Sequence, residues 1–152
     1  MSNRTTERTQ PVPALIFVLS PADITKDYFV ALAADKTTTT GSPGTALLTL
    51  AFVLAEARDV LIQATFCATV VSTPARFIVR INGGAALNKA SISGATVGGG
   101  ALQWKASLPA GAHTVELMWA AADGVNIIYC RPVAEHEGAT LLVRALGNVE
   151  VF

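Results

Sequence analysis

Charged side chains are scarce in this sequence of 152 residues: Asp, Glu, Lys and Arg make up 14% of it, against about 25% in an average soluble domain. The 11 basic and 11 acidic residues give a formal net charge of zero. A nucleic-acid-binding protein needs a concentrated excess of lysine and arginine to neutralise phosphates. We therefore expect no nucleic-acid partner.

Long hydrophobic runs are also missing, although hydrophobic residues make up 51% of the sequence. A membrane-spanning helix requires about 20 consecutive apolar residues, and the longest run, residues 46–57, is interrupted by Thr49 and Glu56. The first ten residues contain no apolar core of the kind found in secretory signals. We expect no membrane partner and no export by that route.

Cysteine is represented by Cys67 and Cys130 alone. Two cysteines are too few for a disulfide framework and lack the close spacing of a zinc site. Each lies within a strand-like apolar run, where cysteine commonly packs as a small hydrophobic side chain. The sequence predicts two free thiols, with no metal and no other cofactor.

Catalytic motifs are absent from the sequence as well. There is no Gly-x-Ser-x-Gly, and His113 and His136 are the two candidate bases for a nucleophilic triad. The compact polar cluster Glu135-His136-Glu137 has no second His or Cys nearby to complete a metal site, so we expect His136 in a solvated loop. No two carboxylates stand out as a glycosidase pair. We expect that the protein is not an enzyme.

Short apolar runs separated by turn residues dominate the chain from Ala46 onward, which is typical of an antiparallel β-sandwich. Asn82-Gly83 and Asp123-Gly124 are strong hairpin signals, because these residues accept the positive φ of primed turns. The Gly-rich tract 93–100 is interpreted as a mobile or tightly curved connection. Strands are expected near residues 46–54, 60–71, 75–82, 100–108, 111–121, 125–131 and 138–146.

The first 45 residues have a different character. Residues 1–13 are polar and end in Pro11-Val12-Pro13, and residues 37–44 read TTTTGSPG, a composition that favours an extended linker. We therefore predict an extended N-terminal arm over residues 1–45 and a β-sandwich domain over residues 46–152.

Several predicted strands are apolar on both faces. An isolated antiparallel sandwich should be apolar inward and polar outward, yet neither face of the run 60–71 carries a charge. Because monomers seldom expose large apolar patches, we predict an obligate homo-oligomer; the alternative is a sandwich covered by its own arm. The candidate interface residues are Leu15, Ile16, Phe17, Val18, Tyr28, Phe29, Leu61, Val71, Leu142 and Leu146.

The stretch GAHTVELMW, residues 111–119, illustrates how polar-looking residues fit a strand. His113 begins the apolar face that includes Trp119, so we expect a strand-end histidine satisfied by the backbone. Trp104 and Trp119 alternate in phase with neighbouring leucines, which favours core positions. A sugar platform at Trp104 is the open alternative.

Three segments carry a family resemblance: FIVRINGGAAL (77–87), LPAGAHTVELMW (108–119) and GATLLVRA (138–145). In this order they resemble the C1q/TNF-like jelly-roll modules of tailed-bacteriophage structural proteins, over roughly residues 46–148. The third segment matches the family's closing strand only loosely. The family's collagen-like or coiled-coil stem is missing, and so are acidic clusters suggestive of calcium sites.

The resemblance implies a two-sheet antiparallel jelly roll that packs as a homotrimer. It further implies a capsid decoration or cement protein, made in the host cytoplasm and located in the virion. Its partners would be further copies of the chain and the major capsid protein or other virion subunits. The alternatives are a receptor- or glycan-binding module at a tail tip or fibre, and an extracellular ligand of the same fold, which the missing signal disfavours.

Overall fold

A computed structural model describes residues 17–18, 26–93, 96–147 and 150–151, and these form strands, turns and loops with no helix. Within that part of the chain no helical segment is therefore long and apolar enough to span a membrane. The strands are β1 (Phe17–Val18), β2 (Lys26–Ala31), β3 (Lys36–Thr38), β4 (Thr45–Leu54), β5 (Arg58–Val70), β6 (Ala75–Ile81), β7 (Asn88–Ile92), β8 (Thr96–Leu108), β9 (Gly111–Ala121), β10 (Ile128–Cys130), β11 (Ala139–Ala145) and β12 (Glu150–Val151).

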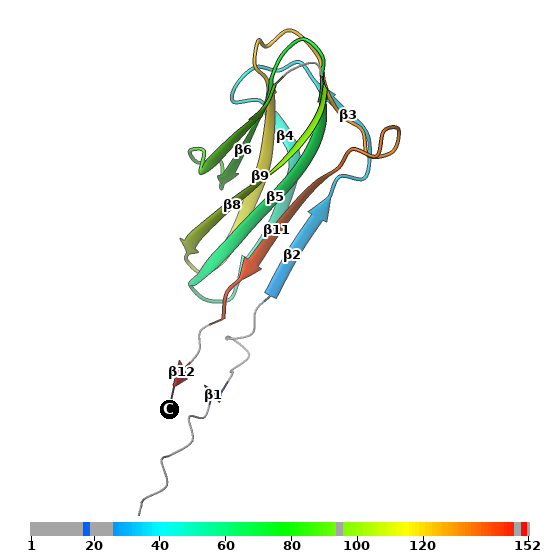
Figure 1. Cartoon of the computed structure of the whole chain (residues 1–152). Coiled ribbons are helices and arrows are strands. Elements are labelled where there is room, and N and C mark those ends of the chain that lie inside the picture. The colour runs from blue at the N-terminus through cyan, green and yellow to red at the C-terminus, as the bar shows by residue number, and fades with distance from the viewer. Residues whose placement is uncertain (1–16, 19–25, 94–95, 148–149, 152) are drawn as a thin grey trace, which may run out of the picture.

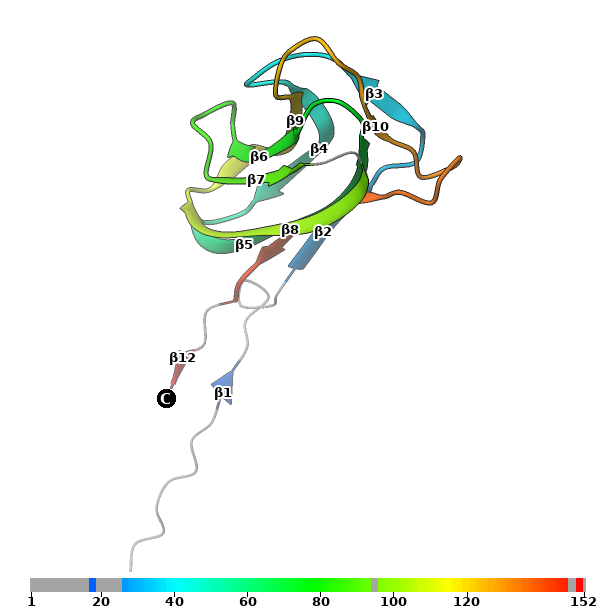
Figure 2. The same ribbon diagram turned by 45° about the horizontal axis from the view of Figure 1, so that its top comes forward.

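Two antiparallel sheets are stacked face to face (Figures 1 and 2). One has the order β4-β9-β6-β7. In the other, β5 pairs with β8 on one side and with β10 and β11, placed end to end, on the other side; β3 and β2 continue outward from β10 and β11. Counting β2 with β3 and β10 with β11 gives two four-stranded layers in jelly-roll order. The predicted all-β jelly-roll sandwich is confirmed.

Alternating side chains build the core between the sheets. On β5 the residues from Val60 to Val70 are buried at every second position, and on β9 the inward series runs from His113 to Ala121. Phe66 of one sheet stacks on Phe77 of the other with ring centroids 3.9 Å apart. The period-2 pattern therefore fixes which face of each strand is inside.

Residues 26–38, assigned above to the N-terminal arm, are strands of the sandwich in the structure. Val30 of β2 pairs with Leu141, and β3 pairs with β10. The stretch from Tyr28 is too short for alternation to distinguish a strand from one helical turn. Both segments lie in the plane of the sheet, so neither covers its outer face. β1 pairs with β12.

The Gly-rich tract is partly a strand, which differs from the predicted connection. Residues 96–100 begin β8 and pair with β5. A Cβ on Gly100 would lie 2.9 Å from the Phe66 ring, and one on Gly98 would lie 2.5 Å from the Ile92 side chain. The glycines therefore permit close packing over two large core side chains. The strand β7, which contains Ile92, differs from the prediction as well, because no strand was expected there.

Candidate interaction surface

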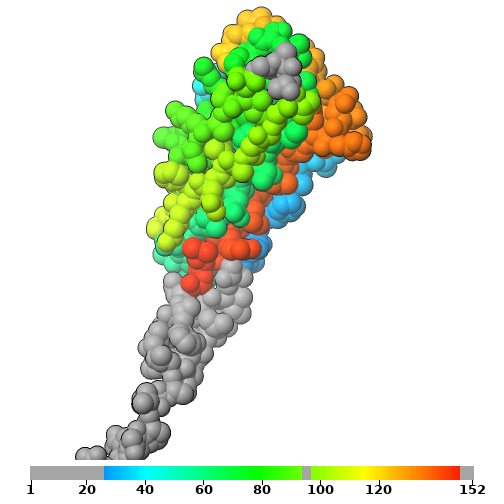
Figure 3. Space-filling view, in the orientation of Figure 1, coloured from blue at the N-terminus to red at the C-terminus, as the bar shows by residue number. Residues whose placement is uncertain are grey.

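Figure 3 shows the outer face of the sheet that contains β2, β11, β5 and β8. Two rows of uncharged side chains cross this face. Strand register places the members of each row directly opposite one another. The first row is Phe29, Leu142, Gln63 and Gln103, and the second is Ala31, Thr140, Thr65 and Ala101. We call these eight residues, with the adjacent Leu61, the neutral face.

The neutral face combines apolar and neutral polar groups. Phe29 is 61% exposed, while Leu61 and Leu142 are half-buried. A shallow hollow of about 280 Å³ is lined mainly by these two rows. The two amides, Gln63 and Gln103, have no hydrogen-bond partner among the described residues. Unless another surface covers this face, the amides hydrogen-bond to water and the apolar side chains are exposed to water.

Paired charges border the neutral face on one side. Arg144 donates two hydrogen bonds to the Asp27 carboxylate, at 2.7 and 2.8 Å, and this lowers the pKa of Asp27. Lys105 lies 2.9 Å from the Asp59 carboxylate. The pKa of Asp59 is lowered first by the hydrogen bond from the Ser107 hydroxyl and then by Lys105. The border therefore carries no net charge.

The structure brings together three of the predicted interface residues: Phe29, Leu61 and Leu142. Tyr28 instead faces inward, with its ring 5.1 Å from that of Phe52 and its hydroxyl donating to the Val53 carbonyl. The others are dispersed: Val71 is exposed after β5, Leu146 is half-buried after β11, Phe17 and Val18 form β1, and Leu15 and Ile16 lie outside the described residues.

Trp104 lies on β8 opposite Ile62 and is 41% exposed. It is in phase with the buried Leu102, but β8 is an edge strand of its sheet, so part of the indole reaches solvent and the predicted core position is wrong. A shallow hollow of about 400 Å³ is lined by Trp104 together with Leu61, Gln103 and Lys105. Trp119, by contrast, is 1% exposed.

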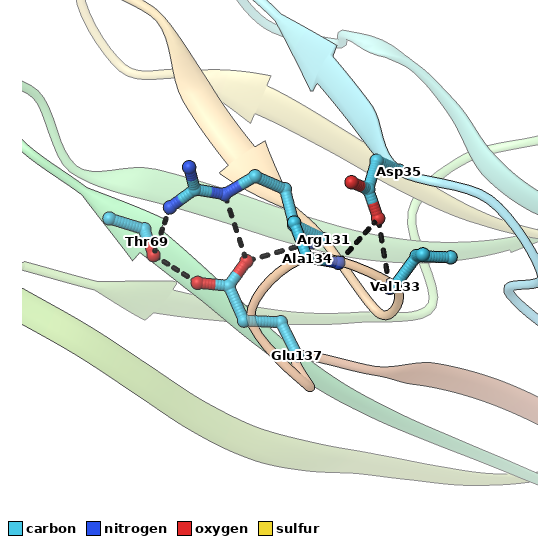
Figure 4. Close-up of polar contacts among 6 residues, drawn as sticks. All are labelled: Asp35, Thr69, Arg131, Val133, Ala134 and Glu137. Atoms are coloured by element: carbon cyan, nitrogen blue, oxygen red, sulfur yellow. Dashed lines mark hydrogen bonds and ion pairs between the residues drawn. The ribbon is translucent and has the colours of Figure 1, made fainter.

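A buried carboxylate joins β10 to β11 where the two strands meet along β5 (Figure 4). Glu137 is 2% exposed. It accepts hydrogen bonds from the Thr69 hydroxyl and from the Arg131 backbone N–H, the latter at 2.8 Å, and the Arg131 Nε lies 3.9 Å away. A buried charge is tolerated when it is paired and hydrogen-bonded in this way.

Asp35 anchors the same loop from the β2–β3 connection. Its carboxylate accepts hydrogen bonds from the backbone N–H groups of Val133 and Ala134, at 2.9 and 3.4 Å (Figure 4). Glu137 is in phase with the inward residues Ala139 and Leu141 of β11. That alternation is the signal that could have identified Glu137 as buried.

Both histidines and both cysteines lie within the described residues. His113 is buried, with its ring nitrogens 2.8 Å from the Pro109 carbonyl and 3.0 Å from the Asn82 amide, so the predicted backbone contact is confirmed. His136 is exposed. Both cysteines are free, as predicted. Burial, and then the nearby Glu137, raise the pKa of Cys130 to about 12 and also raise that of Cys67. Among the described residues no group of three or more His, Cys, Asp or Glu is placed to hold a metal.

The β5–β6 and β9–β10 loops lie at the end of the sandwich opposite the start of β2 (Figure 1). They contain the exposed residues Val71 and Val125, the latter 73% exposed. Asp123 organises the β9–β10 loop by accepting hydrogen bonds from the backbone N–H groups of Val125 and Asn126 and from the Asn126 amide. These bonds, the one from Val125 first, lower the pKa of Asp123 to about 2. The loop is therefore held in one conformation by an exposed carboxylate.

No protein-family model and no curated protein matches the sequence. Three viral structures are similar at the level of the backbone. The T=1 particle derived from infectious bursal virus has a TM-score of 0.48 and 12% identity, over 90% of this chain and 36% of that one. The VP2 subviral particle of infectious bursal disease virus has a TM-score of 0.44 and 11% identity, over 90% and 38%. Broad bean stain virus has a TM-score of 0.33 and 12% identity, over 89% and 92%.

The chain thus spans less than two fifths of the length of the first two structures. Likenesses of this size indicate nothing about activity or partners, and the jelly-roll assignment is based on the strand order itself. The resemblance to C1q/TNF-like phage modules stays a prediction.

Proposed function

We propose that the chain is a structural protein of a virion and that further copies of the chain cover its neutral face. The observation that carries this proposal is the pair of uncharged rows across four strands, with Phe29 61% exposed at one end. Contiguous exposed apolar surface commonly marks a protein–protein contact. The order of sequence segments shared with phage jelly-roll modules provides the virion context.

The energy available from covering this face is modest per copy and grows with the number of contacts. Complete burial of one large apolar side chain stabilises by about 1.5–3 kcal/mol. Phe29, Leu61 and Leu142 would give up to roughly 9 kcal/mol if all three were fully exposed. Phe29 is 61% exposed and the two leucines are half-buried, so about half of that remains. Association itself costs about 4–15 kcal/mol, so several such contacts per copy are needed for a stable assembly.

In its specific form, the proposal is a trimeric decoration or cement protein of a bacteriophage-like capsid. The protein is made in the host cytoplasm and attaches to the major capsid protein or other virion subunits. Residues 1–25, which precede β2, supply the arm. The action is mechanical, because subunit and arm contacts add interface area to the shell, and it requires neither catalysis nor a cofactor.

The abundance of the chain in purified particles tests the virion assignment. Quantitative mass spectrometry should find the chain at a copy number comparable to that of the main shell subunit. Electron microscopy of the chain expressed alone should show small closed oligomers and no complete shells. Absence from particles would refute the proposal, and self-assembly into complete shells would refute the decoration role.

Deletion of residues 1–25 tests the arm. Because β2 begins at Lys26, the truncated chain retains every strand of the sandwich and should keep its thermal unfolding midpoint and its oligomeric state. It should lose attachment to particles in a co-sedimentation assay. Attachment with unchanged affinity would show that the arm is not the tether.

A second candidate is a glycan-binding module at a tail tip or fibre, which the half-exposed Trp104 favours. An indole beside a neutral amide and a cation in a hollow of about 400 Å³ fits a sugar ring. A glycan array should then give a signal that Trp104→Ala removes. A blank array together with high copy number in particles would exclude this role in favour of decoration.

A further inference from the structure

A hollow of about 430 Å³ lies on the outer face of the other sheet, over β6 and β7. Figure 2 shows these two strands side by side. Register places Arg76 opposite Ser91 and Ile78 opposite Lys89. The two cations therefore project from adjacent strands on the same outward face. Ser42 reaches the hollow from the β3–β4 connection, so three separate segments contribute to it. The lining residues are Ser42, Arg76, Phe77, Ile78, Lys89, Ala90 and Ser91.

The charges around this hollow are unbalanced, unlike those elsewhere in the described chain. Arg58, Arg80, Lys105, Arg131 and Arg144 each form an ion pair with a carboxylate.

The remaining described cations, apart from the two at the hollow, also have partners. Lys36 donates to the Leu47 carbonyl, and Lys26 lies over the Tyr28 ring. Within the described part of the chain Arg76 and Lys89 have no ion pair and no side-chain hydrogen bond, and no carboxylate lines their hollow. The hollow is therefore a local concentration of uncompensated positive charge.

The chemistry of the lining selects an oxyanion. The planar guanidinium of Arg76 can donate two parallel hydrogen bonds to a carboxylate, sulfate or phosphate, and the Lys89 ammonium adds a point charge. The hydroxyls of Ser42 and Ser91 are further donors. Ile78 and Ala90 are half-buried and offer an apolar floor. The volume falls in the range of about 300–1,000 Å³ typical of small-molecule sites.

We propose that this hollow binds a small organic oxyanion, with Arg76 and Lys89 holding the charged group and the apolar floor contacting the rest of the molecule. The site lies on the sheet opposite the neutral face. It is therefore compatible with assembly through that face and independent of the proposed virion role.

Calorimetric titration at low salt with phenyl phosphate, inorganic phosphate and phenol tests the proposal. Phenyl phosphate should bind at one site per chain, more tightly than inorganic phosphate, and phenol should not bind measurably. Arg76→Gln should weaken phenyl phosphate binding by about tenfold or more, since one charge-assisted bidentate contact is expected to contribute a factor of that order. Lys89→Gln should weaken it several-fold, and Arg76→Lys should give an intermediate loss.

Lys26→Gln is the matched control, because it removes an exposed cation that lies on the other sheet and lines neither hollow, so it should leave affinity unchanged. All variants alter exposed side chains, and their unfolding midpoints check that each one folds. Absence of saturable binding at millimolar phenyl phosphate would overturn the proposal, as would equal weakening by Lys26→Gln. Equal affinity for phenyl phosphate and inorganic phosphate would overturn the organic part of it.

Discussion

The outer faces of the two sheets differ in the charge of the side chains that neighbouring strands place opposite one another. On the β4-β9-β6-β7 sheet the outward rows carry charge: Arg80 Nε lies 2.5 Å from Glu116 Oε2 between β6 and β9, and Arg76 and Lys89 project nearby. On the other sheet the two central rows contain no charge at all. The same period-2 alternation thus produces a charged face on one layer and a neutral face on the other.

The two faces differ in how their exposed hydrophobic residues are arranged, and not in how exposed those residues are. Val53 on the charged layer is 63% exposed and Phe29 on the neutral face is 61% exposed. Val53 lies opposite Ala112, near one end of its sheet, whereas Phe29 continues a row with Leu142 and Gln63. A single exposed apolar side chain is ordinary, so we attribute significance to the row and not to the residue.

The largest change in the free energy of unfolding is expected at one of two neighbouring leucines on β11. Leu141 is fully buried and Leu142 faces outward. Leu141→Ala should lower the free energy of unfolding by about 2–5 kcal/mol, because it leaves a core cavity. In the dissociated subunit Leu142→Ala should cost less than about 1 kcal/mol. Urea unfolding measures both, and equal losses in the dissociated chain would show that the sequence alternation misassigns the neutral face.

The loop that connects β10 to β11 is expected to give the next largest change in stability. Glu137→Ala removes the acceptor for the Thr69 hydroxyl and the Arg131 backbone, and should destabilise the fold by about 1.5–3 kcal/mol. Glu135→Ala, two residues away and exposed, should change stability by less than about 0.5 kcal/mol. If the two variants melt at the same temperature, the buried carboxylate does not join β10 to β11.

The charged layer should show a measurable but small cross-strand coupling. A double-mutant cycle of Arg80→Ala and Glu116→Ala should give about 0.2–1 kcal/mol, because both partners are partly exposed. The coupling should fall with added salt. The Gln63–Gln103 pair on the neutral face is expected to give no coupling, and a coupling there of similar size would weaken the contrast between the layers.

The smallest change in stability is expected from Asp123, in the β9–β10 loop at one end of the sandwich. The folded pKa of Asp123 is about 2, below its ordinary 3.8. A depressed carboxyl pKa stabilises the fold above the unfolded pKa, and this stabilisation is lost as the pH falls through the folded one. The difference in unfolding midpoint between wild type and Asp123→Ala should therefore be constant above pH about 5 and shrink as the pH falls toward 2 and below. A difference that does not change over this range would exclude the carboxylate as its source.

Much of the fold could be predicted from alternation and turn chemistry. The run from Val60 and the strand 111–121 were assigned correctly because their alternation is long. β2 and β3 fall within the predicted arm because each is short, and their membership of the sheet depends on pairing with β11 and β10. Local sequence does not encode such long-range pairing.

The candidate site was predictable only in part. Leu61 and Leu142 stood out because they interrupt the polar positions of otherwise alternating strands. Their arrangement with Phe29 in one surface depends on register between strands about 80 to 110 residues apart in the chain. The hollow at Arg76 and Lys89 gave no motif, because the pairing of β6 with β7 and the approach of Ser42 bring its parts together.

Light scattering of the wild type, Phe29→Glu and Val53→Glu at micromolar concentration tests whether sister chains bury the neutral face. If they do, a charge at Phe29 should reduce the mass to that of one 15.8 kDa chain. Val53→Glu, equally exposed on the opposite layer, should leave the oligomer intact. A wild type that scatters as a folded 15.8 kDa monomer, or an oligomer that survives Phe29→Glu, would contradict the account.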